Sequence, residues 1–129
     1  MLPEPINDGW EMVLNGIPEP VKKLVRVNIG TSKDLYVVFS ARLDAKHLVF
    51  NSLVSGVWER KHGIYVNTDI FPFTVNSPFE LRIAYQNSTF TFSVNGGFIY
   101  NYTITHPVVI VDRVLIWKKL FVEILKFIY

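Results

Sequence analysis

Apolar and polar residues alternate at period two in several short runs along this chain. In the runs at residues 79–85 and 90–94, large apolar side chains occupy every second position. Because successive side chains of a strand point to opposite faces of a sheet, these runs predict strands with one buried face. Similar runs cover residues 24–29, 35–43 and 48–54.

Residues that favour turns separate these runs. They form clusters at Asn15-Gly16, at residues 30–34 and at residues 76–78. Asn95-Gly96 lies between two alternating runs and predicts a tight hairpin, because both residues tolerate positive φ. Many short strands at this spacing indicate an antiparallel sandwich or barrel.

The last part of the chain allows two interpretations. Lys119, Glu123 and Lys126 are spaced as on one face of a helix, so residues 113–129 fit an amphipathic helix. A basic helix of this kind that carries Trp117 is typical of a segment lying on a membrane surface. Two strands fit the same residues, since periodicity separates short apolar segments poorly. The sequence contains no run of about 20 consecutive apolar residues, so no membrane span is predicted.

Length and composition predict one folded domain that covers residues 1–129. Half of the residues are hydrophobic and 19% are charged, which is typical of a domain with a substantial core. The net charge of +2 is too small to predict a nucleic-acid partner. The chain has no cysteine and residues 1–5 lack signal-peptide features, so we expect a cytoplasmic protein.

The chain shows no pattern typical of an active site. His47, His62 and His106 lack metal-ligand spacing, and neither a nucleophile motif nor a phosphate-binding loop is present. The carboxylates are scattered along the sequence, so none can be paired as acid and base. We therefore expect a protein that is not an enzyme and needs neither a cofactor nor a metal ion.

Three residues in the middle of the chain form a recognisable pattern. Arg42 ends one predicted strand region, Asn51 lies on the next, and Trp58 follows a short turn. In type and spacing they resemble the sugar-binding core of galectins, the β-galactoside-binding lectins, which read His-x-Asn-x-Arg, then Val-x-Asn, then Trp. Val38 stands at the position of the histidine and Ser40 at that of the first asparagine. The chain thus resembles a divergent galectin with a partly lost sugar-binding motif.

The resemblance extends over most of the chain. The residues from Phe71 to Phe79 are similar to the Phe-Pro-Phe-x-x-Gly-x-x-Phe pattern of galectins, with Asn76 at the glycine. Val94-Asn95-Gly96 is similar to a family hairpin, and residues 111–116 resemble the penultimate strand. The resemblance implies an all-β, galectin-like jelly-roll sandwich of two antiparallel sheets. It also implies that the C-terminal residues form strands.

The resemblance implies roles for five residues. In galectins the polar side chains of the motif bind the axial hydroxyl of galactose, and the aromatic ring stacks on the sugar. Arg42 and Asn51 then keep part of the polar set, and Trp58 keeps the stacking ring. Glu59 and Arg60 stand near the Glu and Arg that follow the tryptophan in galectins. Alternatively, Arg42 is a solvated strand residue, Asn51 pairs with backbone, and Trp58 is an ordinary half-exposed aromatic.

The two substituted positions bear on function. Val38 can neither donate nor accept a hydrogen bond, and the hydroxyl of Ser40 is shorter than the amide that it replaces. We therefore expect that β-galactoside binding is weakened or lost, and that the domain acts in protein–protein interaction or recognises an altered ligand. The alternative is a working lectin that binds a galactoside or a sulfated glycan through Arg42, Asn51 and Trp58.

Basic residues gather in the segments that are predicted to frame this site. Lys46 and His47 precede the second of its strands, and Lys61 and His62 follow Trp58. A groove with this rim suits an anionic ligand, such as a sulfated sugar, a phosphate or an acidic peptide. The alternative is a solvated rim of loops with no role in binding.

The chain ends in the apolar residues 127–129. An exposed apolar terminal strand can pair with another chain. Many galectins dimerise through terminal strands, so the resemblance implies a homodimer or contact with a partner domain. It also implies export without a signal peptide in addition to a cytoplasmic location.

Overall fold

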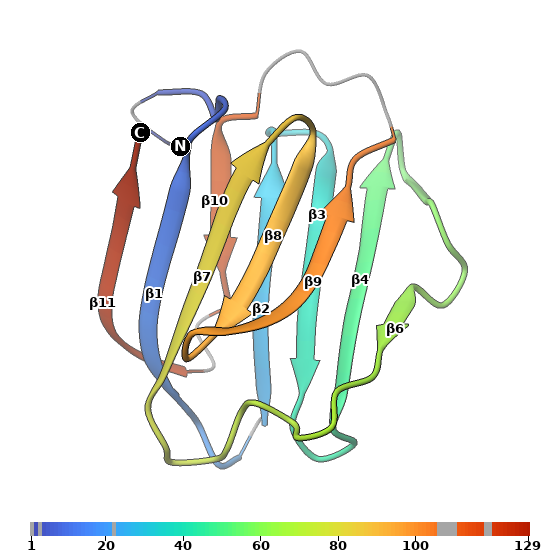
Figure 1. The fold of residues 1–129 in the computed structure, drawn as a ribbon. Coiled ribbons are helices and arrows are strands. Elements are labelled where there is room, and N and C mark those ends of the chain that lie inside the picture. The colour runs from blue at the N-terminus through green and yellow to red at the C-terminus, as the bar shows by residue number, and fades with distance from the viewer. Residues whose placement is uncertain (1, 3, 22, 106–110, 118–119) are drawn as a thin grey trace.

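The computed structural model describes residues 2, 4–21, 23–105, 111–117 and 120–129. Every regular element in these ranges is a strand, and the strands form two antiparallel sheets that face each other (Figure 1). In spatial order, the first sheet consists of β11 (Leu120–Ile128), β1 (Glu11–Pro18), β7 (Phe79–Gln86), β8 (Thr89–Val94) and β9 (Gly97–Thr103). The second consists of β10 (Arg113–Ile116), β2 (Leu24–Gly30), β3 (Leu35–Arg42), β4 (His47–Val54) and β5 (Val57–Trp58), with β6 (Ile64–Val66) paired to β4. The expected two-sheet, all-β fold is confirmed.

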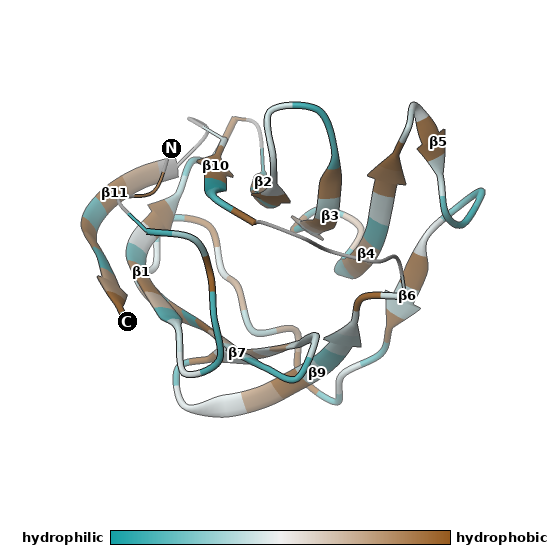
Figure 2. Ribbon diagram, turned by 90° about the horizontal axis from the view of Figure 1, so that it is seen from above, coloured by the Kyte–Doolittle hydropathy of each residue, from teal (hydrophilic) through white to brown (hydrophobic). Residues whose placement is uncertain are grey.

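The core lies between the two sheets and is rich in aromatic side chains. Phe39 of β3 lies with its ring centroid 5.0 Å from that of Phe50 and 5.1 Å from that of Phe92. Phe50 belongs to the neighbouring strand and Phe92 to the opposite sheet, so these rings join the two layers. The layers are seen from above in Figure 2, with β2, β3 and β4 on one side and β7 and β9 on the other. The period-two alternation builds this core, because it turns every second side chain inward.

The turn predictions are confirmed in two places and wrong in a third. Asn95 and Gly96 have φ values of 51° and 82° and join β8 to β9 in a tight hairpin. Asn76 has a φ of 62°, so it adopts the left-handed conformation expected at this position. Asn15-Gly16 is not a turn, because β1 runs on to Pro18 with a register shift between these two residues. Both residues pair with β7 without a shift, and the extra residue at the shift, Glu123, lies in β11, so pairing between distant segments overrides the local turn signal.

The C-terminal residues form strands, and the helical alternative is wrong. β10 pairs with β2, and β11 pairs with β1 of the other sheet. Strands are favoured here because they hydrogen-bond two sheet edges that would otherwise be exposed. Residues 118–119, between the two strands, lie outside the described part of the chain. Within the described ranges, no helix is long and apolar enough to cross a membrane.

We expect the change Phe39→Ala to lower the free energy of unfolding by about 3–5 kcal/mol, because it leaves a cavity among packed rings. Phe39 is fully buried, whereas Phe98 of β9 is exposed. Phe98→Ala serves as the matched control, with an expected change within about 0.5 kcal/mol. Urea unfolding followed by tryptophan fluorescence measures both values. Equal effects of the two changes would contradict this description of the core.

Candidate ligand-binding groove

The outer face of the second sheet carries a row of paired residues. Cross-strand pairing aligns Arg26 of β2 with Ser40 of β3. The row continues through Val49 of β4 to Tyr65 of β6. Directly paired residues share one face of a sheet, and the adjacent Phe39 points into the core, so this row lies on the outer face. In this row the small side chains of Ser40 and Val49 lie between Arg26 and Tyr65.

A groove of about 380 Å³ follows this row. Its volume is at the lower end of the range for small-molecule sites, about 300–1,000 Å³. The lining residues are Arg26, Val38, Ser40, Arg42, Val49, Asn51, Trp58, Lys61, His62 and Tyr65. The groove therefore brings together seven of the residues singled out in the sequence, namely Arg42, Asn51, Trp58, Val38, Ser40, Lys61 and His62.

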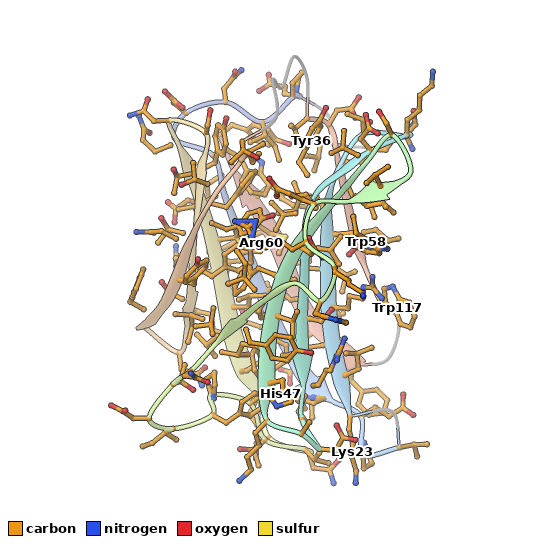
Figure 3. All side chains as sticks on the ribbon, turned by 90° about the vertical axis from the view of Figure 1, so that its right-hand side faces the viewer. Lys23, Tyr36, His47, Trp58, Arg60 and Trp117 are labelled. Atoms are coloured by element: carbon orange, nitrogen blue, oxygen red, sulfur yellow. The ribbon has the colours of Figure 1, made fainter. Side chains whose placement is uncertain are left out.

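Glu59 and Arg60 are turned away from this groove. Glu59 Oε2 accepts a hydrogen bond from the Tyr102 hydroxyl at 3.3 Å, and Glu59 Oε1 accepts one from the Thr105 hydroxyl. Arg60 Nη1 lies 3.9 Å from Glu59 Oε2. Figure 3 shows Arg60 on the side of β4 that faces the first sheet, and Trp58 on the opposite side. Both residues therefore brace the loop that follows β5, and neither lines the groove.

Lys46 and His47 also lie outside the lining of the groove. Lys46 occupies the turn before β4 with a φ of 56°, and it borders a separate hollow beside Leu43. His47 contacts the groove indirectly, because its ring makes a T-shaped contact with the Tyr65 ring at a centroid distance of 5.0 Å. The basic rim of the groove thus comes from Lys61 and His62.

The side-chain amide of Asn51 is bound to backbone on both of its polar atoms. Asn51 Oδ1 accepts hydrogen bonds from the backbone N–H groups of Ser52 at 2.9 Å and Arg60 at 3.1 Å. Asn51 Nδ2 donates to the backbone carbonyl of Arg60 at 2.7 Å. The backbone-pairing interpretation of Asn51 is therefore the one seen here. This clamp holds the loop that carries Lys61 and His62 over the groove.

A second polar cluster ties the same loop to the first sheet. The buried Ser52 hydroxyl donates to the Tyr36 carbonyl at 2.6 Å and lies 2.5 Å from the Tyr102 hydroxyl. Tyr102 belongs to β9, and it reaches Glu59 across the edge of the sandwich. Burial of the Tyr102 hydroxyl raises its pKa, and the nearby Glu59 carboxylate raises it further, although the Ser52 hydrogen bond opposes both. Tyr102 therefore keeps its proton and can donate to this carboxylate.

Positive charge in the groove is not balanced by acidic side chains. Among the described residues, no carboxylate lines the groove and none forms an ion pair with Arg26, Arg42 or Lys61. Arg26 is partly buried, and its guanidinium lies 5.2 Å from the centre of the Trp117 ring. Burial lowers the pKa of Arg26, and the positive charge of Arg42 lowers it further. The groove therefore presents two arginines that repel each other.

Apart from the small Val49 of the floor, Arg26 and Tyr65 are the lining residues that sequence reasoning did not single out. A signal for Arg26 was available, because the alternation of residues 24–29 places Arg26 and Asn28 opposite the buried Val25 and Val27. Knowing that β2 pairs with β3 would then have placed Arg26 beside Ser40. No comparable signal exists for Tyr65, because its position depends on the path of the loop after Trp58.

Two aromatic rings stand at the opening of the groove. Trp58 is 43% exposed and Tyr65 is 46% exposed, so both offer ring surface to a ligand. Among the described residues, no group of three or more histidine, aspartate or glutamate side chains is placed to hold a metal ion. His106 lies outside the described residues. The groove as built suits a small ligand with a flat apolar face and an acidic group.

We expect Asn51→Ala to lower the free energy of unfolding by about 1–3 kcal/mol, because it leaves the buried N–H of Ser52 and the partly buried backbone groups of Arg60 without partners. Asn101→Ala is the matched control. Its side-chain oxygen accepts a hydrogen bond from Thr91 at an exposed position, so the expected change is below about 1 kcal/mol. Urea unfolding gives both values, and a smaller loss for Asn51→Ala than for Asn101→Ala would rule out the clamp.

Comparison with known proteins places this fold and groove in a wider context. The model of the family described as galactoside-binding lectin matches residues 1–127. No curated protein sequence matches the chain significantly.

Three solved structures share the fold at low sequence identity. The Caenorhabditis elegans galectin LEC-6 superposes with a TM-score of 0.81 at 20% identity, over 100% of this chain and 89% of that one. Chicken galectin 2 gives a TM-score of 0.83 at 20% identity, over 98% and 95%. Xenopus laevis galectin-Ib gives 0.80 at 18% identity, over 98% and 96%. Because the family model covers nearly the whole chain, this protein belongs to the galactoside-binding lectins, the galectins.

Proposed function

We propose that residues 1–129 form a single non-catalytic binding domain in which recognition of neutral β-galactosides is weakened or lost. The domain then binds an altered ligand or takes part in protein–protein interaction. The observation that carries this proposal is the state of the polar set in the groove. Val38 offers no polar atom, Ser40 offers one hydroxyl, and the Asn51 amide is bound to backbone.

The remaining polar groups are too few for the galactoside mode of the family. Arg42 is exposed on the groove side, and Trp58 keeps a ring for stacking. Glu59, which follows Trp58, hydrogen-bonds to Tyr102 and Thr105 instead of facing a ligand. Each net hydrogen bond contributes about 0.5–1.5 kcal/mol, so the loss of about three weakens binding by roughly ten- to a thousandfold. Hydroxyl groups of a sugar exchange water partners for protein partners with little gain, which leaves no reserve to absorb this loss.

We expect isothermal titration calorimetry to show no saturable binding of lactose up to about 10 mM. This range would reveal even a Kd of 1 mM, which corresponds to a binding free energy of only about 4 kcal/mol. The same titration on the Arg42→Ala variant shows whether any heat comes from the groove. A millimolar or tighter Kd for lactose that is abolished by Arg42→Ala would overturn the proposal. It would instead support a working lectin that uses Arg42, Asn51 and Trp58.

We also propose that the domain associates with a second copy through β11. This strand is at the edge of the first sheet, and it bears exposed apolar side chains on both faces. Phe121 is 61% exposed and Ile124 is 54% exposed. Phe127 of the same strand packs against Trp10 with ring centroids 5.9 Å apart, which fixes the strand to the sandwich. An anchored apolar edge strand of this kind is a template for continuing the sheet into another chain.

We expect sedimentation velocity to show a dimer of the wild type and a monomer of Ile124→Lys, because a charge at an edge strand opposes pairing. Ile70→Lys is the matched control, since Ile70 is 83% exposed and lies in the segment between β6 and β7. This control should remain dimeric. A dimerisation Kd near 10 μM would make most of the protein dimeric at about 100 μM. A wild type that stays monomeric at this concentration would therefore exclude the proposed dimer.

Family membership supports the remaining parts of the proposal. The galectin family consists of carbohydrate-binding lectins rather than enzymes, which supports a role without catalysis. The family resemblance also supports a cytoplasmic location, with export by a route that needs no signal peptide. The proposed ligand, a glycan or a protein partner, would then be present in the cytoplasm or outside the cell.

A further inference from the structure

A second hollow lies at the end of the sandwich where β1 begins and β11 ends (Figure 1). Its volume is about 230 Å³, below the range of about 300–1,000 Å³ that is usual for small-molecule sites. None of its lining residues lines the groove on the second sheet, so it is a separate site that takes only a small ligand. The lining residues are Glu4, Pro5, Asn7, Asp8, Trp10 and Tyr129.

Backbone hydrogen bonds hold one wall of this hollow, the segment before β1, against both sheets. The N–H of Ile6 donates to the carbonyl of Val111, just before β10, at 2.7 Å. The N–H of Gly9 donates to the carbonyl of Tyr85 in β7 at 3.0 Å. Because the wall is fixed in the free protein, binding of a ligand costs little additional ordering.

Two carboxylates stand on this wall. Asp8 Oδ1 accepts a hydrogen bond from the backbone N–H of Asn87 at 2.9 Å, which fixes the side chain. Within the described ranges, neither Glu4 nor Asp8 forms an ion pair, and no basic side chain lines the hollow. Tyr129 is 49% exposed, so its ring face is open to a cation. The hollow therefore attracts positive charge.

The indole of Trp10 adds a hydrogen-bond donor. Trp10 is only 1% exposed, and its Nε1 has no acceptor among the described residues. The ring stacks on Phe127 at a centroid distance of 5.9 Å and makes a T-shaped contact with Phe90 at 6.5 Å, and neither side chain can accept a hydrogen bond. A buried N–H without a partner is unfavourable. Because Trp10 lines the hollow, a ligand there can supply the missing acceptor.

We propose that this hollow binds a small amino alcohol, whose ammonium group lies between Glu4 and Asp8 while its hydroxyl oxygen accepts the indole N–H of Trp10. The ring of Tyr129 covers the ammonium group through a cation–π contact. The two carboxylates repel an anionic ligand, and a neutral alcohol leaves them without a counter-ion. The hollow is separate from the groove, so this proposal goes beyond the proposed function and does not depend on it.

Three ligands of similar size separate the two contacts. Ethanolamine carries both groups, ethylamine lacks the oxygen, and ethylene glycol lacks the charge. An NMR titration follows the indole N–H signal of Trp10, which the Trp10→Phe variant identifies among the three tryptophans of the chain. Ethanolamine is expected to saturate this signal with a millimolar Kd, about three- to tenfold tighter than ethylamine. Ethylene glycol should leave the signal unshifted.

Variants assign the binding to the two carboxylates. Glu4→Gln and Asp8→Asn are each expected to weaken the binding of ethanolamine about threefold, and the double variant about tenfold. Asp8→Asn keeps an oxygen to accept the N–H of Asn87. Asp44→Asn is the matched control, because Asp44 Oδ1 also accepts a backbone N–H, in the β3–β4 turn at the other end of the sandwich. This control should leave the Kd unchanged.

Trp10→Phe removes the donor but keeps an aromatic ring. Ethanolamine and ethylamine are expected to bind this variant equally, as read from the backbone amide signal of Asp8. If thermal unfolding shows that Trp10→Phe does not fold, the comparison of the two amines on the wild type still tests the donor, and Glu4→Gln changes only an exposed side chain.

The other outcomes count against the proposal. If ethanolamine gives no saturable shift of the Trp10 signal, the hollow holds only water. A shift that persists unchanged in the double variant places the amine elsewhere, and equal binding of ethylamine to the wild type removes the oxygen contact. Tighter binding of glycinamide, an amine beside an amide carbonyl, replaces the amino alcohol with a peptide N-terminus.

Discussion

The side-chain amide of Asn51 is the contact on which the groove depends. With two acceptor contacts and one donor contact to backbone, it fixes the loop after β5 against β4. Its neighbour Ser52 points to the other face of β4 and joins Tyr102 of the opposite sheet. Two consecutive residues on one strand thus hold the loop from both sides, because successive side chains alternate between faces.

This arrangement gives residues of the galectin pattern a structural role in holding the loop. Asn51 keeps the residue type and spacing of the galectin pattern, yet its amide supports the loop. Glu59 is drawn to Tyr102 and Thr105 at the sheet edge. Lys61 and His62 occupy the space over the groove in its place. The loop therefore turns basic side chains to the groove, while its acidic residue Glu59 binds at the sheet edge.

Much of the fold follows from the sequence, because alternation and turn residues act locally. The inward Phe39 and the outward Arg42 follow from period two, and the hairpin at Asn95-Gly96 follows from its tolerance of positive φ. The turn predicted at Asn15-Gly16 is absent because both residues pair with β7, a contact between distant parts of the chain. The site was harder to predict. Where Glu59 points and how near Arg26 lies to Arg42 depend on loop path and strand pairing, which are set by contacts between distant residues.

The charges in the groove form an unbalanced pair. Burial and the charge of Arg42 both disfavour the charged form of Arg26, so this pair opposes folding. The Trp117 ring compensates only in part, since a cation–π contact contributes about 0.5–2 kcal/mol. Residues that break a local rule without a compensating partner are expected at functional sites. An anionic group between the two guanidiniums would reduce their repulsion, which is a physical argument for the altered ligand proposed above.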